Sequence, residues 1–154
     1  MVPDHIGWTL WQATLVWRRD FLAAMVAAGH GWFAQARGNI VVYIGPNGVR
    51  QGDLADRAHL TKQAVQQFVD ELVQDGIVLR TRDETDARAR WVRLTPAGEA
   101  AMQDADRIKV EIETRWRSQI GAQGFATLDR ALRQVIALNP QPGLPGNPQS
   151  GKKA

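Results

Sequence analysis

Apolar residues recur at helical spacing near the start of the chain. Two apolar faces fall between residues 8 and 28, one made by Trp11, Leu15, Leu22 and Val26 and the other by Leu10, Trp17, Phe21 and Met25. Because steps of three and four residues keep each set on one side of a helix, the pattern predicts one helix that is buried on two sides. The glycines around His30 end it, and a second apolar segment runs from residue 32 to about 44.

The middle of the chain changes period from helix to strand. Residues 51–58 predict a short helix, and Thr61 is a good N-cap for a longer helix that ends at Gly76. The longer helix directs one apolar stripe inward, which consists of Val65, Phe68, Val69 and Leu72. A short helix, a tight turn and a longer helix are typical of a helix-turn-helix.

Two alternating stretches, "IVLRTR" and "RWVRL", follow this pair of helices. They predict two strands, with Val92 and Leu94 inward and Trp91 and Arg93 outward. The six residues from Asp83 to Arg88 form the tip between them. Helices and hairpin together predict a winged helix-turn-helix.

Two further helices are predicted after Pro96. The first runs over 97–120, and its stripe consists of Ala101, Ala105, Ile108, Ile112, Trp116 and Ile120. The second follows residues 121–124, and its stripe consists of Phe125, Leu128, Leu132, Val135 and Ile136. At ~1.5 Å per residue the first is about 36 Å long, which overhangs so small a domain and favours pairing with a second copy. The alternative is an intramolecular bundle.

These elements predict a mainly α fold with a small β-hairpin wing. Residues 1–138 are expected to form one domain, in which 8–44 and 96–138 make a helical dimerisation layer and 50–95 make the winged helix-turn-helix lobe. Residues 139–154 have no core-forming pattern and are expected to be disordered.

Charge is informative only where it clusters, because the formal net charge is +3. The exposed first half of the longer helix carries Lys62, Gln63, Gln66 and Gln67 and no acid. All acids of this helix lie in its second half. A helix that enters DNA by its N-terminal end needs this asymmetry, since donors meet bases and phosphates there. The alternative is that these polar side chains only solvate an amphipathic helix.

The wing mixes both signs of charge but remains net positive. Its arginines are Arg80, Arg82, Arg88, Arg90 and Arg93, and its acids are Asp83, Glu84 and Asp86. An arginine at a hairpin tip loses side-chain entropy when it enters a groove, and a neighbouring carboxylate can aim it beforehand. We expect the Asp86 carboxylate to hold the Arg88 guanidinium in position and Arg88 to contact DNA.

The stretches "LADRAHLTKQAVQQFVDELVQDGIVLR", "DARAR" and "LTPAG" resemble, in order, the helix-turn-helix, wing and following helix of the MarR family of bacterial transcriptional regulators. The resemblance covers roughly residues 8–138. It implies a homodimer on double-stranded DNA, with recognition helices in successive major grooves and wing arginines in minor grooves. It also implies that a small aromatic or phenolic effector weakens DNA binding.

The expected function is a ligand-responsive repressor that binds a palindromic operator. The residues expected to bind DNA are Arg50, Thr61, Lys62, Gln63, Gln66, Gln67, Arg82, Asp86, Arg88 and Arg90. An effector pocket is predicted at Trp11, Trp17, His30 and Phe33, although these rings could equally be packing and His30 could be a helix cap.

Other classes of function lack support in the sequence. The chain has no cysteine, and its three histidines have no metal-ligand or catalytic spacing, so we expect no enzyme activity, metal or cofactor. No apolar run is long enough to span a membrane, and a cytoplasmic protein is expected. A winged helix that contacts protein, or a small-molecule carrier, remains as an alternative.

Overall fold

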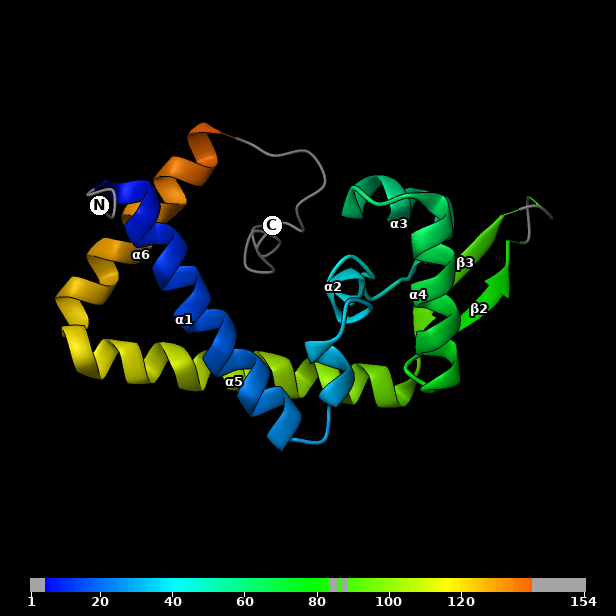
Figure 1. Ribbon diagram of the computed structural model, residues 1–154, viewed down its shortest axis with the longest axis horizontal. Coiled ribbons are helices and arrows are strands. Elements are labelled where there is room, and N and C mark those ends of the chain that lie inside the picture. Colours follow the sequence, from blue (N-terminus) through cyan, green and yellow to red (C-terminus); the bar gives the residue numbers. More distant parts are fainter. Residues whose placement is uncertain (1–4, 84–85, 87–88, 140–154) are drawn as a thin grey trace, which may run out of the picture. The chain divides into compact units, whose positions relative to one another are not determined.

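The computed structural model describes residues 5–83, 86 and 89–139. The elements follow in the order α1 (Ile6–Ala27), η1 (Gly31–Ala34), α2 (Gly38–Val41), β1 (Val49–Arg50), α3 (Gln51–Ala58), α4 (Lys62–Gln74), β2 (Val78–Arg82), β3 (Arg90–Leu94), α5 (Pro96–Ile120) and α6 (Ala122–Leu138) (Figure 1). The tail predicted to be disordered lies, after Asn139, outside the described residues.

The chain divides into two compact units. The helical unit combines Met1–Gln35 with Ala100–Arg133, and the winged-helix unit combines Ala36–Glu99 with Gln134–Ala154. Each unit is described separately below.

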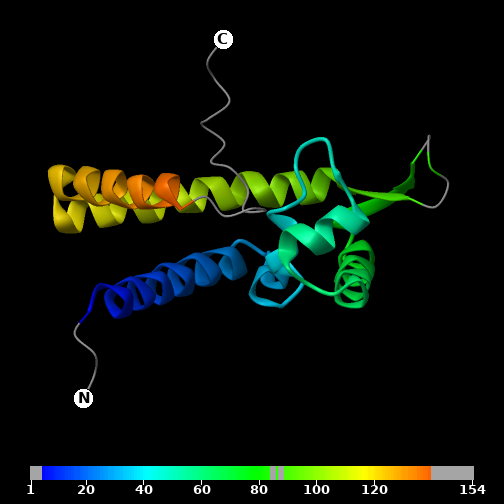
Figure 2. The same ribbon diagram turned by 90° about the horizontal axis from the view of Figure 1, so that it is seen from above.

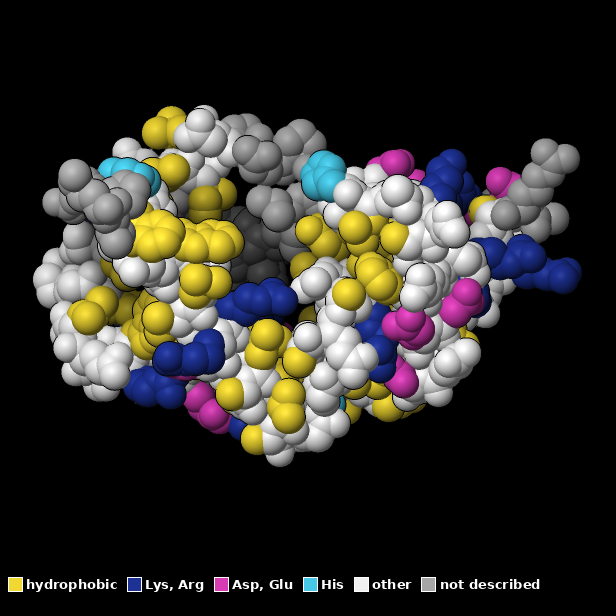
Figure 3. Space-filling model, viewed as in Figure 1, with side chains coloured by type: hydrophobic (Ala, Val, Ile, Leu, Met, Phe, Trp, Pro, Cys, Tyr) yellow, Lys and Arg dark blue, Asp and Glu magenta, His cyan; other side chains and the backbone are white. Residues whose placement is uncertain are grey.

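In the helical unit, α1 begins two residues before the predicted start. His5 caps it, since His5 Nδ1 accepts a hydrogen bond from the backbone N–H of Trp8 at 3.2 Å. Burial on two sides of α1 was wrong for the single chain. Phe21 and Met25 are buried, but the face that contains Trp11 is exposed, and apolar side chains can be seen along α1 in Figure 3.

The apolar segment predicted at 32–44 is two short helices rather than one long one. In the helical unit, η1 buries Trp32 and Phe33. In the winged-helix unit, α2 buries Ile40 and Val41. The burial was therefore predictable from the apolar residues, while the breaks in the backbone were not.

The helix-turn-helix forms as predicted. Helix α3 spans the expected residues, and His59 at its end adopts the left-handed conformation with φ 53°. Thr61 Oγ1 accepts from the backbone N–H of Ala64 at 3.1 Å and so caps α4. After α4, Gly76 has φ 71°, a conformation that favours glycine at a helix C-terminus.

The wing is part of a three-stranded antiparallel sheet with strand order β1-β3-β2 (Figure 1). Within the predicted hairpin, Val78 pairs with Leu94 and Arg82 with Arg90. The two-residue strand β1 was not predicted, because two residues are too few for an alternating pattern. It adds the pair Val49 and Val92 to the sheet.

Helix α5 begins at Pro96, one residue before the predicted start at 97, and Thr95 caps it. Thr95 Oγ1 accepts from the backbone N–H of Gly98 at 3.1 Å and donates to the carbonyl of Gly76 at 2.6 Å. A Cβ atom on Gly98 would lie 2.2 Å from the carbonyl oxygen of Ile77, so only glycine fits there.

Helices α5 and α6 follow each other along the chain, from green through yellow to orange in Figure 2, and they differ in the burial of their apolar stripes. The first four residues of the α5 stripe are buried, whereas Ile120 is 51% exposed. Helix α6 begins at Ala122, earlier than predicted, and none of its residues is buried. Leu132 is 38% exposed and Ile136 is 64% exposed.

Candidate nucleic-acid interface

The first turns of α4 present polar side chains to solvent. Lys62 and Gln63 are exposed, and neither side chain has a hydrogen bond or ion pair to another described residue. Thr61 is also exposed, but its oxygen is engaged in the helix cap. The start of α4 therefore combines one free cation with one free amide.

The acids in the second half of α4 are matched by arginines from other elements. Arg37, just before α2, donates through Nε to Asp75 at 2.8 Å and lies 3.4 Å from Glu71. Arg80 of β2 pairs with Asp70. The negative charge that electrostatics would keep away from DNA is thus largely compensated within the unit.

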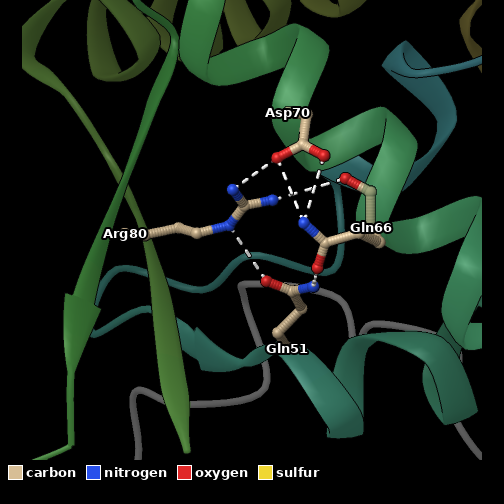
Figure 4. A network of polar contacts seen from close by, with 4 residues as sticks. All are labelled: Gln51, Gln66, Asp70 and Arg80. Carbon is tan, nitrogen blue, oxygen red and sulfur yellow. Dashed lines mark hydrogen bonds and ion pairs between the residues drawn. The ribbon is translucent and has the colours of Figure 1, made fainter.

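A closed ring of polar contacts, the Arg80 ring, joins α4 to α3 and β2 (Figure 4). Arg80 donates through Nε to Gln51 Oε1 at 3.0 Å and through Nη1 to Asp70 Oδ1 at 2.5 Å. Gln51 Nε2 donates to Gln66 Oε1 at 2.6 Å, and Gln66 Nε2 donates to both Asp70 oxygens at 3.1 Å. Arg80 Nη2 also reaches the backbone carbonyl of Gln66 at 3.3 Å.

The Arg80 ring also affects ionisation. The hydrogen bond from Arg80, and after it the one from Gln66, lowers the pKa of the Asp70 carboxyl below its ordinary range. Asp70 therefore stays ionised and keeps accepting these bonds at neutral pH.

An open hollow of about 470 Å³ lies beside the Arg80 ring within the winged-helix unit. Its remaining walls include Arg50, Ala89 and Arg90, with Gly52 and Asp53 from the start of α3. Arginines outnumber the one acid in the lining, although Arg50 and Arg80 are paired with Asp83 and Asp70.

The base of the wing is organised by a buried carboxylate, Asp83, which is 8% exposed. Asp83 Oδ2 accepts from the indole Nε1 of Trp91 at 2.8 Å and lies 2.7 Å from Arg50 Nη2. Asp83 Oδ1 accepts from the backbone N–H of Asp86 at 3.3 Å. The guanidinium groups of Arg50 and Arg93 lie 5.9 and 5.5 Å from the centre of the Trp91 ring.

The buried acid at this position was missed because charge counting treats all wing acids alike. Trp91, predicted to face outward, is half-buried because Asp83 holds its indole. Arg50, predicted to contact DNA, already pairs with the same carboxylate. The predicted hairpin contained a signal for this contact. Arg82 pairs with Arg90 across the two strands, Asp83 directly follows Arg82, and Trp91 directly follows Arg90.

The other predicted wing residues are distributed along the hairpin. Arg82 is exposed, and its side chain has no partner among the residues that the structure describes. Arg90 is exposed and donates through Nη1 to the carbonyl of Ala89 at 3.4 Å. Asp86 is exposed, and its predicted partner Arg88 lies outside the described residues.

The residues predicted to bind an effector are only partly brought together in the helical unit. Trp17 stacks on Phe21 with ring centres 5.1 Å apart, and Phe21 meets Phe33 edge to face at 5.9 Å. Trp11 is 56% exposed.

His30 caps no helix with its side chain; its Nε2 instead lies 2.9 Å from the Asp104 carboxylate. That contact and a second one from Arg107 lower the pKa of Asp104. Packing therefore accounts for two of the four residues, and the contact with the Asp104 carboxylate accounts for a third.

Residues 37–89 match a family model described as the MarR family. This stretch contains α3, α4 and β2 and ends just before β3. Over these residues the chain is similar to the MarR family.

Solved structures of regulators share the MarR-type fold over most of the chain. The transcriptional repressor CouR, bound to a 23-mer DNA duplex, is 22% identical, with 86% of this chain and 93% of that chain covered at a TM-score of 0.68. A MarR-family regulator from Rhodococcus sp. RHA1 is 22% identical, with 88% and 94% covered at 0.65. A probable transcriptional regulator from Pseudomonas aeruginosa is 25% identical, with 86% and 98% covered at 0.65. No curated protein matches the sequence.

No helix among the described residues has the length and apolar content needed to cross a membrane. No three histidine or acidic side chains within residues 5–83, 86 and 89–139 are grouped as metal ligands would be.

Proposed function

We propose that this MarR-like chain is a sequence-specific DNA-binding transcriptional regulator. The observation that carries the proposal is the charge arrangement of the winged helix. Lys62 and Arg82 are exposed without an acidic partner among the described residues, whereas Asp70 is paired with Arg80. Free cations at the start of the recognition helix and on the wing, with compensated acids behind them, suit a polyanionic partner.

The contacts divide into holding and sequence-reading roles. Lys62 and the exposed wing arginines hold phosphates or enter a minor groove, and the start of α4 lies in the major groove. Arg90 takes part from the start of β3, and Arg88, which lies outside the described residues, remains an expected DNA contact. Arg50 contributes through its place at the wing base.

The active form is a homodimer on an approximately palindromic operator. Support comes from α6, which carries an apolar stripe but buries no residue, and from the exposed face of α1. Exposed apolar helices of this kind normally associate, and twofold pairing is the commonest arrangement. Two recognition helices then meet half-sites about 10 base pairs apart.

The regulator is a repressor that a small aromatic effector releases from DNA. The assignment rests on the expected effector residues Trp11, Trp17, His30 and Phe33, of which Trp17 and Phe33 each pack against Phe21. Aromatic carboxylates and phenols are therefore titrated against tryptophan fluorescence and against a preformed DNA complex. Binding without any loss of DNA affinity across the panel would remove effector control from the proposal.

Selection from random duplexes, followed by a salt series on the selected site, tests DNA binding itself. Log affinity is expected to fall steeply with log salt, and Arg82→Ala is expected to reduce the slope by about one. Arg18→Ala in α1 is the matched control, because it removes the same charge from an exposed position outside the winged helix. Association that ignores salt would instead favour a protein-contact winged helix.

A further inference from the structure

The three glutamines in the first half of α4 are not equivalent. Gln66 uses both ends of its amide in the Arg80 ring. Gln67 donates through Nε2 to Glu71 at 3.0 Å. Gln63 has no hydrogen bond to any described residue. Three identical side chains thus differ in their hydrogen bonds to the described residues of the folded chain.

The polarity of the Arg80 ring determines how the Gln66 amide is turned. An arginine side chain can only donate, and an ionised aspartate can only accept. Because Arg80 donates to Gln51 Oε1, Gln51 must offer its NH₂ group to Gln66 Oε1. Gln66 then has only its own NH₂ group to offer Asp70. Reversing either amide would place donor against donor or acceptor against acceptor.

Reading a base is incompatible with this state of Gln66. A glutamine recognises adenine by donating to N7 and accepting from N6 at the same time. To do so, Gln66 would have to release Gln51 and Asp70 and leave hydrogen-bonding groups of the ring without partners. Gln63 could make the same pair of contacts without breaking any bond to a described residue.

We infer that Gln63 is the glutamine of α4 that reads a base and that Gln66 is a positioning residue, held by Arg80 to set α4 against β2 and α3. Arg80 supports this role doubly, since its Nη2 also reaches the Gln66 backbone carbonyl. The inference rests on the proposed DNA-binding function and assigns the residues within it.

Base-preference profiles of full-length variants test the assignment. Gln63→Ala is expected to flatten the preference at one base pair of each half-site by about tenfold, within the range of a lost bidentate contact. Gln66→Ala and Gln66→Met are expected to weaken binding to all duplexes by a similar factor and to leave the shape of the profile unchanged. Gln74→Ala, also an exposed glutamine of α4, is the control and should match the parent.

Double variants add a readout of the ring itself. Gln51→Ala with Gln66→Ala should weaken DNA binding little more than either change alone, because each already opens the ring. Gln63→Ala with Gln66→Ala should multiply their separate effects. Arg80→Lys should behave like an open ring although it keeps the charge, since an ammonium lacks the planar fork that reaches three partners.

The possible outcomes separate this inference from the proposed function. A parent chain that selects no sequence would overturn DNA reading as a whole. A selective parent whose Gln66→Ala and Gln66→Met variants lose preference at one base pair, while Gln63→Ala keeps the full profile, would overturn only the assignment made here. Multiplying effects of Gln51→Ala and Gln66→Ala would also overturn it, because they would show that the two amides act separately.

Discussion

Helices α4 and α6 carry apolar stripes of the same kind and use them differently. In α4, Val65, Val69 and Leu72 are fully buried against the rest of the winged-helix unit. In α6, Leu132 is 38% exposed and Val135 is 60% exposed. The comparison teaches that helical periodicity predicts an apolar face on a helix, and that it does not say whether the rest of the same chain covers that face.

The largest expected effect follows from removing a covered side chain of α4. Leu72→Ala is expected to lower the free energy of unfolding by about 2–5 kcal/mol, because the fully buried leucine leaves a cavity. Urea denaturation followed by circular dichroism measures it, with Val73→Ala, at an exposed position of the same helix, as the control. Equal destabilisation by both changes would contradict the burial difference.

A charge placed on the exposed apolar stripe of α6 tests whether this stripe mediates self-association. Leu132→Glu is expected to weaken self-association by at least about tenfold, since each leucine buried between chains contributes roughly 1.5–3 kcal/mol. Light scattering across a dilution series measures the change. Gln134→Glu adds the same charge to an exposed polar position of α6 and should leave association intact. A parent chain that is monomeric at micromolar concentration would refute the dimer.

Two aspartates of the wing show the same contrast in burial, because Asp83 is buried and Asp86 is exposed. Asp83→Ala is expected to cost about 1–3 kcal/mol of stability, because Trp91 and Arg50 lose their shared acceptor at a buried position. It should also alter tryptophan fluorescence and weaken DNA binding.

Asp86→Ala is expected to leave stability almost unchanged and to weaken DNA binding less than Asp83→Ala, since Asp86 is exposed. The bracing hypothesis predicts weaker binding, whereas loss of a negative charge alone predicts tighter binding. Tighter operator binding by an intact Asp86→Ala dimer would show that this acid only moderates the charge of the wing.

The smallest expected effect is on the pH dependence of stability, and it compares an aspartate on the polar side of α4 with one on the polar side of α6. Asp70 has a lowered pKa through Arg80, so folding favours its ionised form. Its contribution to stability is therefore present above the ordinary aspartate range and is lost as pH falls through and below that range. Asp70→Asn should reduce the acid sensitivity of unfolding between neutral pH and pH ~3. The control is Asp129→Asn, whose ion pair with Arg133 lies within α6 alone.

Local signals were sufficient to predict the helix-turn-helix. The cap at Thr61 and the glycine at Gly76 act over a few residues, so sequence spacing alone places both ends of α4. The stripe of α4 was also predicted, although Phe68 is only half-buried. Strand β1 escaped prediction because its two residues are ordered by pairing with β3.

The candidate interface was predicted in composition and not in detail. The order along α4, with cation and amides first and acids later, places exposed Lys62 and Gln63 in its first turn and half-buried Asp70 and Glu71 in its second half. The sequence offered no reason to separate Gln63 from Gln66, because the distinction depends on Arg80 and Gln51 from other elements. In the sequence, Asp83 likewise cannot be distinguished from the other acids of the wing, because its role depends on the hydrogen bond from the Trp91 indole.

By itself, then, the sequence determined the helix-turn-helix, the cap of α4, its apolar stripe and the distribution of charge along it, since these depend on contacts within a few residues. Only the tertiary structure decided which polar groups are already satisfied and which apolar faces are left exposed. The reason is that hydrogen bonds and burial join residues from separate elements, as between Arg80 and Asp70, and their geometry exists only once those elements have packed.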